Sequence, residues 1–264
     1  MKKFTTDNPY LKDQFIVKQY GESKVKIMYC NTLREAGWED LREKKAYKRG
    51  EENDEKLSQS LTRSRTCVRE YVLCNPWDWW CTFTINPENY DRYDLDVFYK
   101  DFAKFINNYN SKTCDCEEHK VKYLLVPEQH EDGAWHMHGF IKGIRPEDLY
   151  INQYGYQTWK QYEKKFGFIS MSEIKNIEKA ASYAIKYMTK NADKNVQELN
   201  KHMYYCSKGL HKAVELFRGR ADYLSDKWDW EHPEGFCKIK TLDVNKDDIH
   251  DYIKVHNEIS EDID

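Results

Sequence analysis

Residues 127–140 read Pro-Glu-Gln-His-Glu-Asp-Gly-Ala-Trp-His-Met-His-Gly-Phe, and this stretch predicts a β-hairpin in the middle of the fold. Asp132-Gly133 is a dipeptide that favours tight turns, and it lies between two short apolar-rich runs. Because successive side chains of a strand point to opposite faces, His136 and His138 share one face. The hairpin therefore presents two imidazoles side by side.

The partner strand of this hairpin adds further metal-binding groups. Glu128 and His130 also share a face, and hairpin pairing can bring them opposite the two histidines. Two imidazoles with a carboxylate or a third imidazole make a workable site for a divalent metal. The expected ligands are His136, His138 and Glu128, with His130 as the alternative third ligand. The structural alternative is a half-exposed strand with polar side chains facing outward.

The composition indicates a folded, aromatic-rich protein. Among 264 residues, 33% are charged, 40% are hydrophobic and 15% are aromatic, which excludes a disordered chain. No apolar run approaches the length of a membrane span, and the Met-Lys-Lys start is followed by polar residues instead of a signal-peptide core. Eight scattered cysteines then favour free thiols in a reducing cytoplasm.

The net charge of −3 conceals a strong asymmetry along the chain. Residues 160–220 contain 13 Lys and Arg against 6 Asp and Glu, whereas residues 241–264 contain 2 against 8. A lysine-rich segment is often only a solvated surface. An excess of this size beside a candidate metal site favours a polyanionic partner.

The order of predicted elements indicates an α+β fold. Trp77–Ile85 is rich in strand-forming residues, Leu95–Tyr109 has the apolar spacing of an amphipathic helix, and a second such helix covers Ser172–Asn191. With the hairpin between the helices, this order predicts a central antiparallel sheet of about five strands with flanking helices. No phosphate-loop or dinucleotide motif is present, so no nucleotide partner is expected.

Three regions follow from these patterns. Residues 1–64 form an N-terminal extension, residues 65–220 form the main domain, and residues 221–264 form a C-terminal segment that ends in an acidic tail.

The second predicted helix carries a pair of tyrosines. Tyr183 and Tyr187 are four residues apart and stand one above the other, with Lys190 on the same flank. A phenol has a pKa near ~10 and is a weak nucleophile at neutral pH. A divalent ion that polarises a phosphate, together with a nearby lysine, would compensate, so metal and tyrosine together indicate phosphoryl transfer onto the protein. The alternative is that both rings belong to the edge of the core.

These motifs resemble those of a known superfamily. His136-Met137-His138 resembles the His-hydrophobe-His signature of the HUH endonucleases, and specifically of rolling-circle replication initiators from phages, prophages and small plasmids. Residues 82–85, Thr-Phe-Thr-Ile, resemble the first strand motif of that family. Glu128 stands where many members have a third metal ligand, and the Tyr-x-x-Lys helix resembles the third motif.

The resemblance implies a fold and a chemistry. The fold would be an HUH/RRM-like palm domain, and the enzyme would use Mg²⁺ or Mn²⁺ to nick single-stranded origin DNA, or its hairpin form. It would stay attached to the 5′ end through a phosphotyrosine, and the free 3′ hydroxyl would prime synthesis by a host polymerase. Because the chain lacks a nucleotide-binding motif, the helicase would also come from the bacterial host, in whose cytoplasm the protein would work.

The resemblance also suggests roles for the tyrosine helix. Some members pair two tyrosines, each followed by a lysine, as in Tyr183-Lys186 and Tyr187-Lys190; others use one nucleophile preceded by lysine, which Tyr187 also fits. Tyr187 is therefore the first candidate and Tyr183 the second. Another Tyr-x-x-Lys at Tyr205 lies outside this helix. A half zinc site, Cys114-x-Cys116-x-x-His119, lacks a fourth ligand and is more simply a set of incidental thiols.

A third stretch is a candidate DNA contact. The segment 150–165 interleaves aromatic and basic residues, a composition typical of surfaces that stack single-stranded bases beside phosphates. The residues expected to contact DNA are Tyr156, Trp159, Lys160, Lys164 and Lys165.

Other functions stay open. A relaxase or a single-strand transposase would share this chemistry and differ in the DNA that it recognises. A metal-stabilised DNA-binding regulator would lack nicking activity and would use the tyrosines only structurally.

Overall fold

The computed structural model describes residues 10–34, 54–113, 116–192 and 202–256. The chain divides into two compact units: unit 1 is Met1–Tyr47 with Lys212–Asp264, and unit 2 is Lys48–His211. These limits differ from the expected boundaries after residues 64 and 220. The reason is long-range pairing, because strands from both ends of the chain join in one sheet of unit 1.

Unit 2 has an antiparallel sheet, which confirms the predicted α+β class. The sheet has seven strands in the order β6-β7-β8-β3-β5-β4-β9, more than the five or so expected, because three very short strands extend its edges. The strands are β3 (Trp79–Thr84), β4 (Lys122–Gln129), β5 (Trp135–Lys142), β6 (Leu149–Ile151), β7 (Gln157–Trp159), β8 (Ile169–Glu173) and β9 (Tyr205–Cys206).

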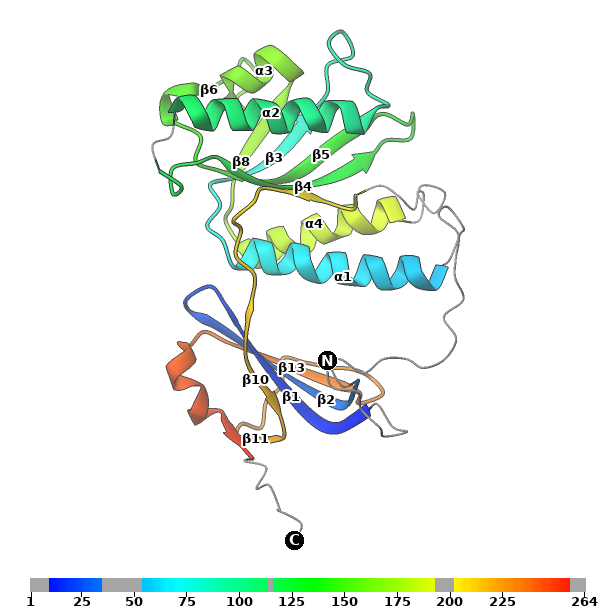
Figure 1. Cartoon of the computed structure of the whole chain (residues 1–264), viewed down its shortest axis with the longest axis vertical. Helices are drawn as coiled ribbons and strands as arrows, with labels where there is room; N and C mark the ends of the chain where they lie inside the picture. Colours follow the sequence, from blue (N-terminus) through cyan, green and yellow to red (C-terminus); the bar gives the residue numbers. More distant parts are fainter. Residues whose placement is uncertain (1–9, 35–53, 114–115, 193–201, 257–264) are drawn as a thin grey trace. The chain divides into compact units, whose positions relative to one another are not determined.

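Helices cover both faces of this sheet (Figure 1). One face packs against α2 (Leu95–Thr113) and α3 (Lys160–Phe166), and the short 3-10 helix η1 (Pro146–Asp148) precedes β6. The other face packs against α1 (Asp54–Leu73) and α4 (Ile177–Ala192). Strand alternation therefore divides the side chains of β3, β4 and β5 between two separate cores.

The predicted hairpin is confirmed as β4 and β5, with Gly133 in the turn at a φ of 85°. The predicted strand at Trp77–Ile85 and helix at Leu95–Tyr109 are confirmed as β3 and α2. The second tyrosine-bearing helix begins later than expected, at Ile177 instead of Ser172. The reason is that β8 extends to Glu173 and its residues pair with β3, so the backbone there is extended.

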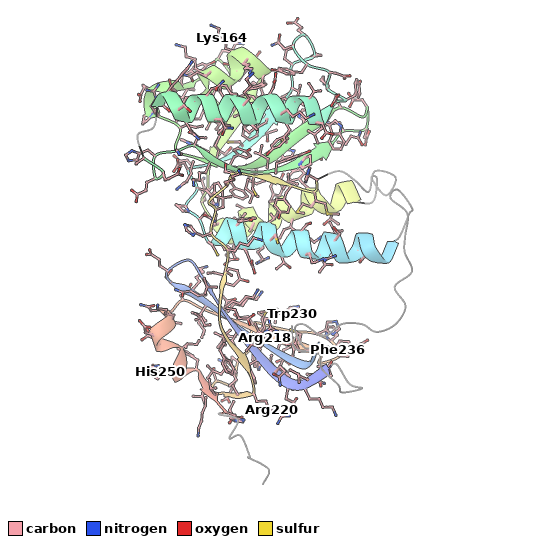
Figure 2. The ribbon with its side chains drawn as sticks, in the orientation of Figure 1. Lys164, Arg218, Arg220, Trp230, Phe236 and His250 are labelled. Atoms are coloured by element: carbon pink, nitrogen blue, oxygen red, sulfur yellow. The ribbon has the colours of Figure 1, made fainter. Side chains whose placement is uncertain are left out.

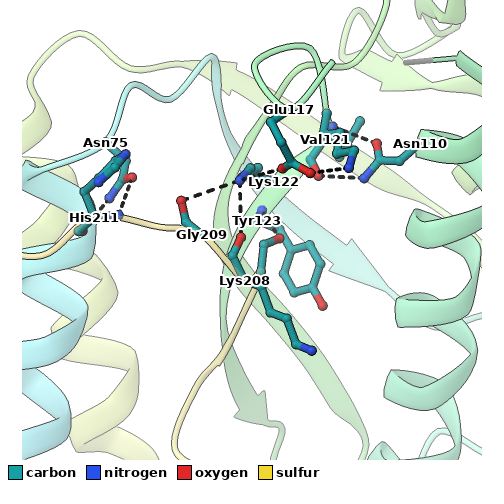
Figure 3. Close-up of polar contacts among 11 residues, drawn as sticks. Asn75, Asn110, Glu117, Val121, Lys122, Tyr123, Lys208, Gly209 and His211 are labelled. Carbon is teal, nitrogen blue, oxygen red and sulfur yellow. Dashed lines mark hydrogen bonds and ion pairs between the residues drawn. The ribbon is translucent and has the colours of Figure 1, made fainter. Parts of the chain in front are cut away.

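The segment after α4 returns to the edge of the sheet and is fixed there by polar contacts (Figure 3). The Nζ atom of Lys122 donates to the carbonyl oxygens of Lys208 at 3.3 Å and Gly209 at 3.5 Å. The side-chain amide of Asn75 donates to the His211 carbonyl at 2.8 Å and accepts from the His211 amide at 2.9 Å. These bonds satisfy backbone groups that lie outside the strand pairing.

Unit 1 has a five-stranded sheet in the order β10-β1-β2-β13-β12. The strands are β1 (Tyr10–Tyr20), β2 (Lys24–Arg34), β10 (Val214–Gly219), β12 (Trp230–Glu231) and β13 (Cys237–Leu242). One face carries Val17, Val25 and Ile27, which are fully buried in the core of the unit. The 3-10 helix η3 (Lys246–Asp251) and the two-stranded sheet of β11 (Ala221–Tyr223) and β14 (Ile253–Val255) also contribute to this core.

In the parts of the chain that the structure describes, no helix is both long and apolar enough to cross a membrane.

Gly139 lets β4 and β5 approach each other closely, and this yields a stability prediction. A Cβ atom there would lie 2.0 Å from the Leu124 carbonyl oxygen, a backbone atom. Gly139→Ala should lower the free energy of unfolding by about 3 kcal/mol or more, measured by urea denaturation. The control Gly155→Ala has open space but a φ of 82°, and should cost only about 1–2 kcal/mol. Equal losses in the two variants would contradict this account of the β4–β5 contact.

Candidate active site

The best-defined polar contact of the site joins β4 to β5. The Nε2 atom of His138 lies 2.6 Å from Oε2 of Glu128, and both side chains are buried. The other ring nitrogen, Nδ1, lies 3.2 Å from the hydroxyl of Thr82 on β3. Partners on both ring nitrogens fix the orientation of the His138 imidazole.

His136 lies directly opposite Glu128 in the strand register. Its ring packs against that of His130, with centroids 4.0 Å apart. Burial lowers the pKa of His136 to about 4, and the positive charges of His130, His138 and Arg92 act in the same direction. At neutral pH the His136 imidazole is therefore uncharged, which is the form that can bind a metal ion.

The structure brings part of the expected ligand set into direct contact. His138 and Glu128 are hydrogen-bonded, while His136 shares their face of the sheet and packs against His130. Among the described residues, no three His, Cys, Asp or Glu side chains form a ready metal-binding group. The donor chemistry, imidazole nitrogen with carboxylate oxygen, nevertheless suits a divalent ion.

Tyr187 of α4 lies directly against this polar pair. Its ring stacks on the His138 imidazole with centroids 3.9 Å apart and an angle of 10° between the planes. The Tyr187 hydroxyl donates to the Tyr183 hydroxyl at 2.7 Å. Burial, then the hydrogen bond and charge of Tyr183, then the charge of Glu128 raise the pKa of Tyr187 well above that of a free phenol. Its proton is therefore firmly held in this arrangement.

Trp80 completes the aromatic part of the site. From β3 it lies 5.6 Å from the ring of Tyr183, 6.4 Å from that of Tyr187 and 6.3 Å from that of His138, between centroids. Sequence reasoning treated Trp80 only as one of many aromatic side chains. The signal for its position was its spacing, because Trp80 is two residues before Thr82 and therefore shares its face.

Helix α4 is held in place by α1. The Arg65 guanidinium donates to the Thr189 hydroxyl at 2.7 Å, and Arg69 forms an ion pair with Glu178 at 3.2 Å. Lys186 is exposed on α4 beside the tyrosines. Lys190 belongs to the same helix, but its side chain lies outside the described residues.

The alternative Tyr-x-x-Lys motif faces away from the histidines. Tyr205 pairs with Leu125 in the register of β9 and β4, so it lies on the α2 face. Its ring stacks on Tyr99 with centroids 3.9 Å apart. Of the half zinc site, Cys114 lies outside the described residues, and Cys116 is an exposed free thiol.

The expected DNA-contacting residues lie on the other face of the sheet from Tyr187, because α3 packs with α2. Lys160 and Lys164 are exposed there, and Lys164 is labelled in Figure 2. Tyr156 is also exposed, while the Lys165 ammonium lies 4.8 Å from the centre of the Phe166 ring.

Trp159 requires a correction. It is fully buried, with its ring against Phe105 and Tyr109, so it has no free face for a base. Strand β7 turns this residue into the core of the α2 face, which the local mixture of aromatic and basic residues did not reveal.

One comparison with known proteins bears on this site. Residues 78–192 match a family model of replication-associated proteins, the ORF2 family. The matched segment runs from just before β3 through α4 and includes the histidines, Glu128 and both tyrosines. No curated protein and no solved structure matches the chain. The family match supports a role in initiating rolling-circle DNA replication, with DNA as the partner.

The lowered pKa of His136 predicts a pH-dependent stability. The unfolded histidine binds a proton below about pH 6.5, whereas the folded one does so only near pH 4, so stability is lost as pH falls through this window. In EDTA, the free energy of unfolding should drop by about 2 kcal/mol between pH 6.5 and pH 4 through this residue. His136→Gln should flatten the profile, whereas His211→Gln, an exposed histidine of unit 2, should not. Parallel profiles for wild type and His136→Gln would contradict the assignment.

Proposed function

We propose that the chain is a metal-dependent nicking and strand-joining enzyme that initiates rolling-circle replication on single-stranded origin DNA. The observation that carries this proposal is the stacking of Tyr187 on His138 at 3.9 Å, within the segment that matches the replication-associated family. A nucleophile and a metal ligand in van der Waals contact can act on one phosphate.

His136, His138 and Glu128 would hold the ion, with His130 as the alternative third ligand. Bound Mg²⁺ or Mn²⁺ would supply electrophilic polarisation of the scissile phosphate. The low pKa of His136 keeps its ring nitrogen free of a proton at neutral pH, and Thr82 orients the His138 ring through Nδ1.

Tyr187 would be the nucleophile. Its Oη atom attacks the phosphorus, a 5′-phosphotyrosine ester forms, and the bond to the 3′ oxygen breaks to leave a free 3′ hydroxyl. Because the pKa of Tyr187 is raised, its proton must leave as the new bond forms. The Tyr183 hydroxyl, 2.7 Å away, already accepts a hydrogen bond from Tyr187 and is placed to receive that proton.

Tyr183 would have the second role of a paired-tyrosine enzyme. It is 46% exposed, so a second DNA end can reach it while Tyr187 is occupied. Attack by the released 3′ hydroxyl on the phosphotyrosine reverses the first step and rejoins the strand. Lys186 and Lys190 are the lysines of the two Tyr-x-x-Lys motifs and would stabilise phenolate or phosphate charge.

The remaining partners follow from this chemistry. The 3′ hydroxyl would prime a host polymerase, and a host helicase would separate the strands, since the chain has no nucleotide-binding motif. Relaxases and single-strand transposases share the same steps, and the DNA substrate distinguishes them.

The decisive experiment is a cleavage assay with labelled single-stranded origin DNA from the protein's own replicon, Mn²⁺ and denaturing gels. Wild type should form a covalent protein–DNA adduct and an EDTA-sensitive nick. Tyr187→Phe should abolish the first adduct, Tyr183→Phe should impair rejoining, and His136→Ala should slow nicking by about 100-fold or more. Tyr205→Phe is the matched control, since this phenol faces the other core, and it should behave as wild type.

Two outcomes would overturn the proposal. An adduct that persists when Tyr183 and Tyr187 are both phenylalanine would place the nucleophile elsewhere. Binding of the correct origin strand without any nick or adduct would instead identify a DNA-binding regulator in which the stacked tyrosines are structural.

A further inference from the structure

Two cysteines of unit 1 face each other across neighbouring strands. Cys30 of β2 and Cys237 of β13 are directly opposite in the antiparallel register. The amide of the next residue, Asn31, donates to the carbonyl oxygen of Phe236 at 2.9 Å. That bond places Cys30 and Cys237 in a non-hydrogen-bonded pair, the type in which opposing side chains come closest.

This arrangement suits a disulfide. Non-hydrogen-bonded pairs have Cα atoms about 4.5 Å apart, at the short end of the roughly 4.4–6.8 Å range in which disulfides form. Both thiols are free and half-buried, so a small oxidant can reach them.

The surroundings of Cys30 show that the two sulfurs interact. Burial raises the pKa of the Cys30 thiol to about 11, and the charge and hydrogen bond of Cys237 act in the same direction. Arg218 of β10, labelled in Figure 2, lowers that pKa through its positive charge. The thiols therefore rest as a protonated pair beside a cation that can stabilise a transient thiolate.

We propose that Cys30 and Cys237 are a reversible disulfide site, oxidised by a low-molecular-weight disulfide such as oxidised glutathione. One protein thiolate attacks the glutathione disulfide, forms a mixed disulfide and releases one glutathione thiolate. The second cysteine attacks the mixed disulfide, forms the Cys30–Cys237 bond and releases the second glutathione. The two protons of the protein thiols pass to the two glutathiones, which are reduced as the cysteines are oxidised.

The bond would connect the two ends of the chain. Strand β2 precedes unit 2 in the sequence and β13 follows it, so the covalent loop would contain the whole of unit 2. Closing so long a loop restricts the unfolded chain and stabilises the sheet of unit 1. This inference does not depend on the nicking chemistry, because the histidines and tyrosines of the proposed active site belong to unit 2.

The test uses the full-length protein. Wild type is incubated with oxidised glutathione, free thiols are alkylated, and the digest is analysed by mass spectrometry. The expected product is a linked peptide pair containing Cys30 and Cys237, which dithiothreitol reverses. Cys116→Ser, which removes an exposed thiol of unit 2, should still give the pair, whereas Cys30→Ser should not.

A second measurement needs no variant. Limited proteolysis of unit 1 should be at least about tenfold slower in the oxidised wild type than in the same sample after dithiothreitol. Alkylation of both cysteines after oxidation, glutathione retained on either one, or linkage of either to another cysteine would overturn the proposal. A linked pair without any change in proteolysis would overturn the stabilising role.

Discussion

The pairing register of β4 with β5 is the constraint on which the candidate active site depends. It sets Glu128 opposite His136 and Val126 opposite His138, so carboxylate and imidazoles share the face that meets α4. A slip of one residue would turn these groups into the apolar core under α2. Buried Met137 and Trp135 on one face and Phe140 on the other oppose such a slip, because it would exchange large apolar side chains for polar ones.

Helix packing then brings the tyrosines to the histidines. Ala181, Ala184 and Met188 form the buried stripe of α4, and they pack on Leu124, Val126 and Phe140 of the sheet. Small alanine side chains allow the helix axis to lie close to the strands. Tyr187, one residue before Met188, lies at the edge of that stripe, where the apolar face gives way to the His138–Glu128 pair. The same packing that stabilises the helix therefore positions its phenol.

Local patterns were enough to predict the hairpin and the two amphipathic helices, because their turn dipeptide and their apolar spacing of two or 3.6 residues are written in neighbouring residues. The stacking of Tyr187 on His138 was foreseen only as proximity, since sequence spacing cannot give a register between a helix and a sheet. Trp159 was misjudged for the same reason: its neighbours resemble a basic aromatic surface, but its strand turns it inward. The start of α4 was misplaced because β8 forms by pairing with β3, which is distant in sequence.

The sheet of unit 1 illustrates the limit of local reasoning most clearly. Its strands β1 and β2 come from the beginning of the chain, whereas β10, β12 and β13 come from its end. Unit 2 is continuous in sequence and closes mostly local contacts, so it should fold first during synthesis. The β2–β13 contacts must wait until the whole of unit 2 has been made, because their loop-closure entropy cannot be offset earlier. Completion of unit 1, and with it the meeting of Cys30 and Cys237, is therefore the last step expected in the folding of this chain.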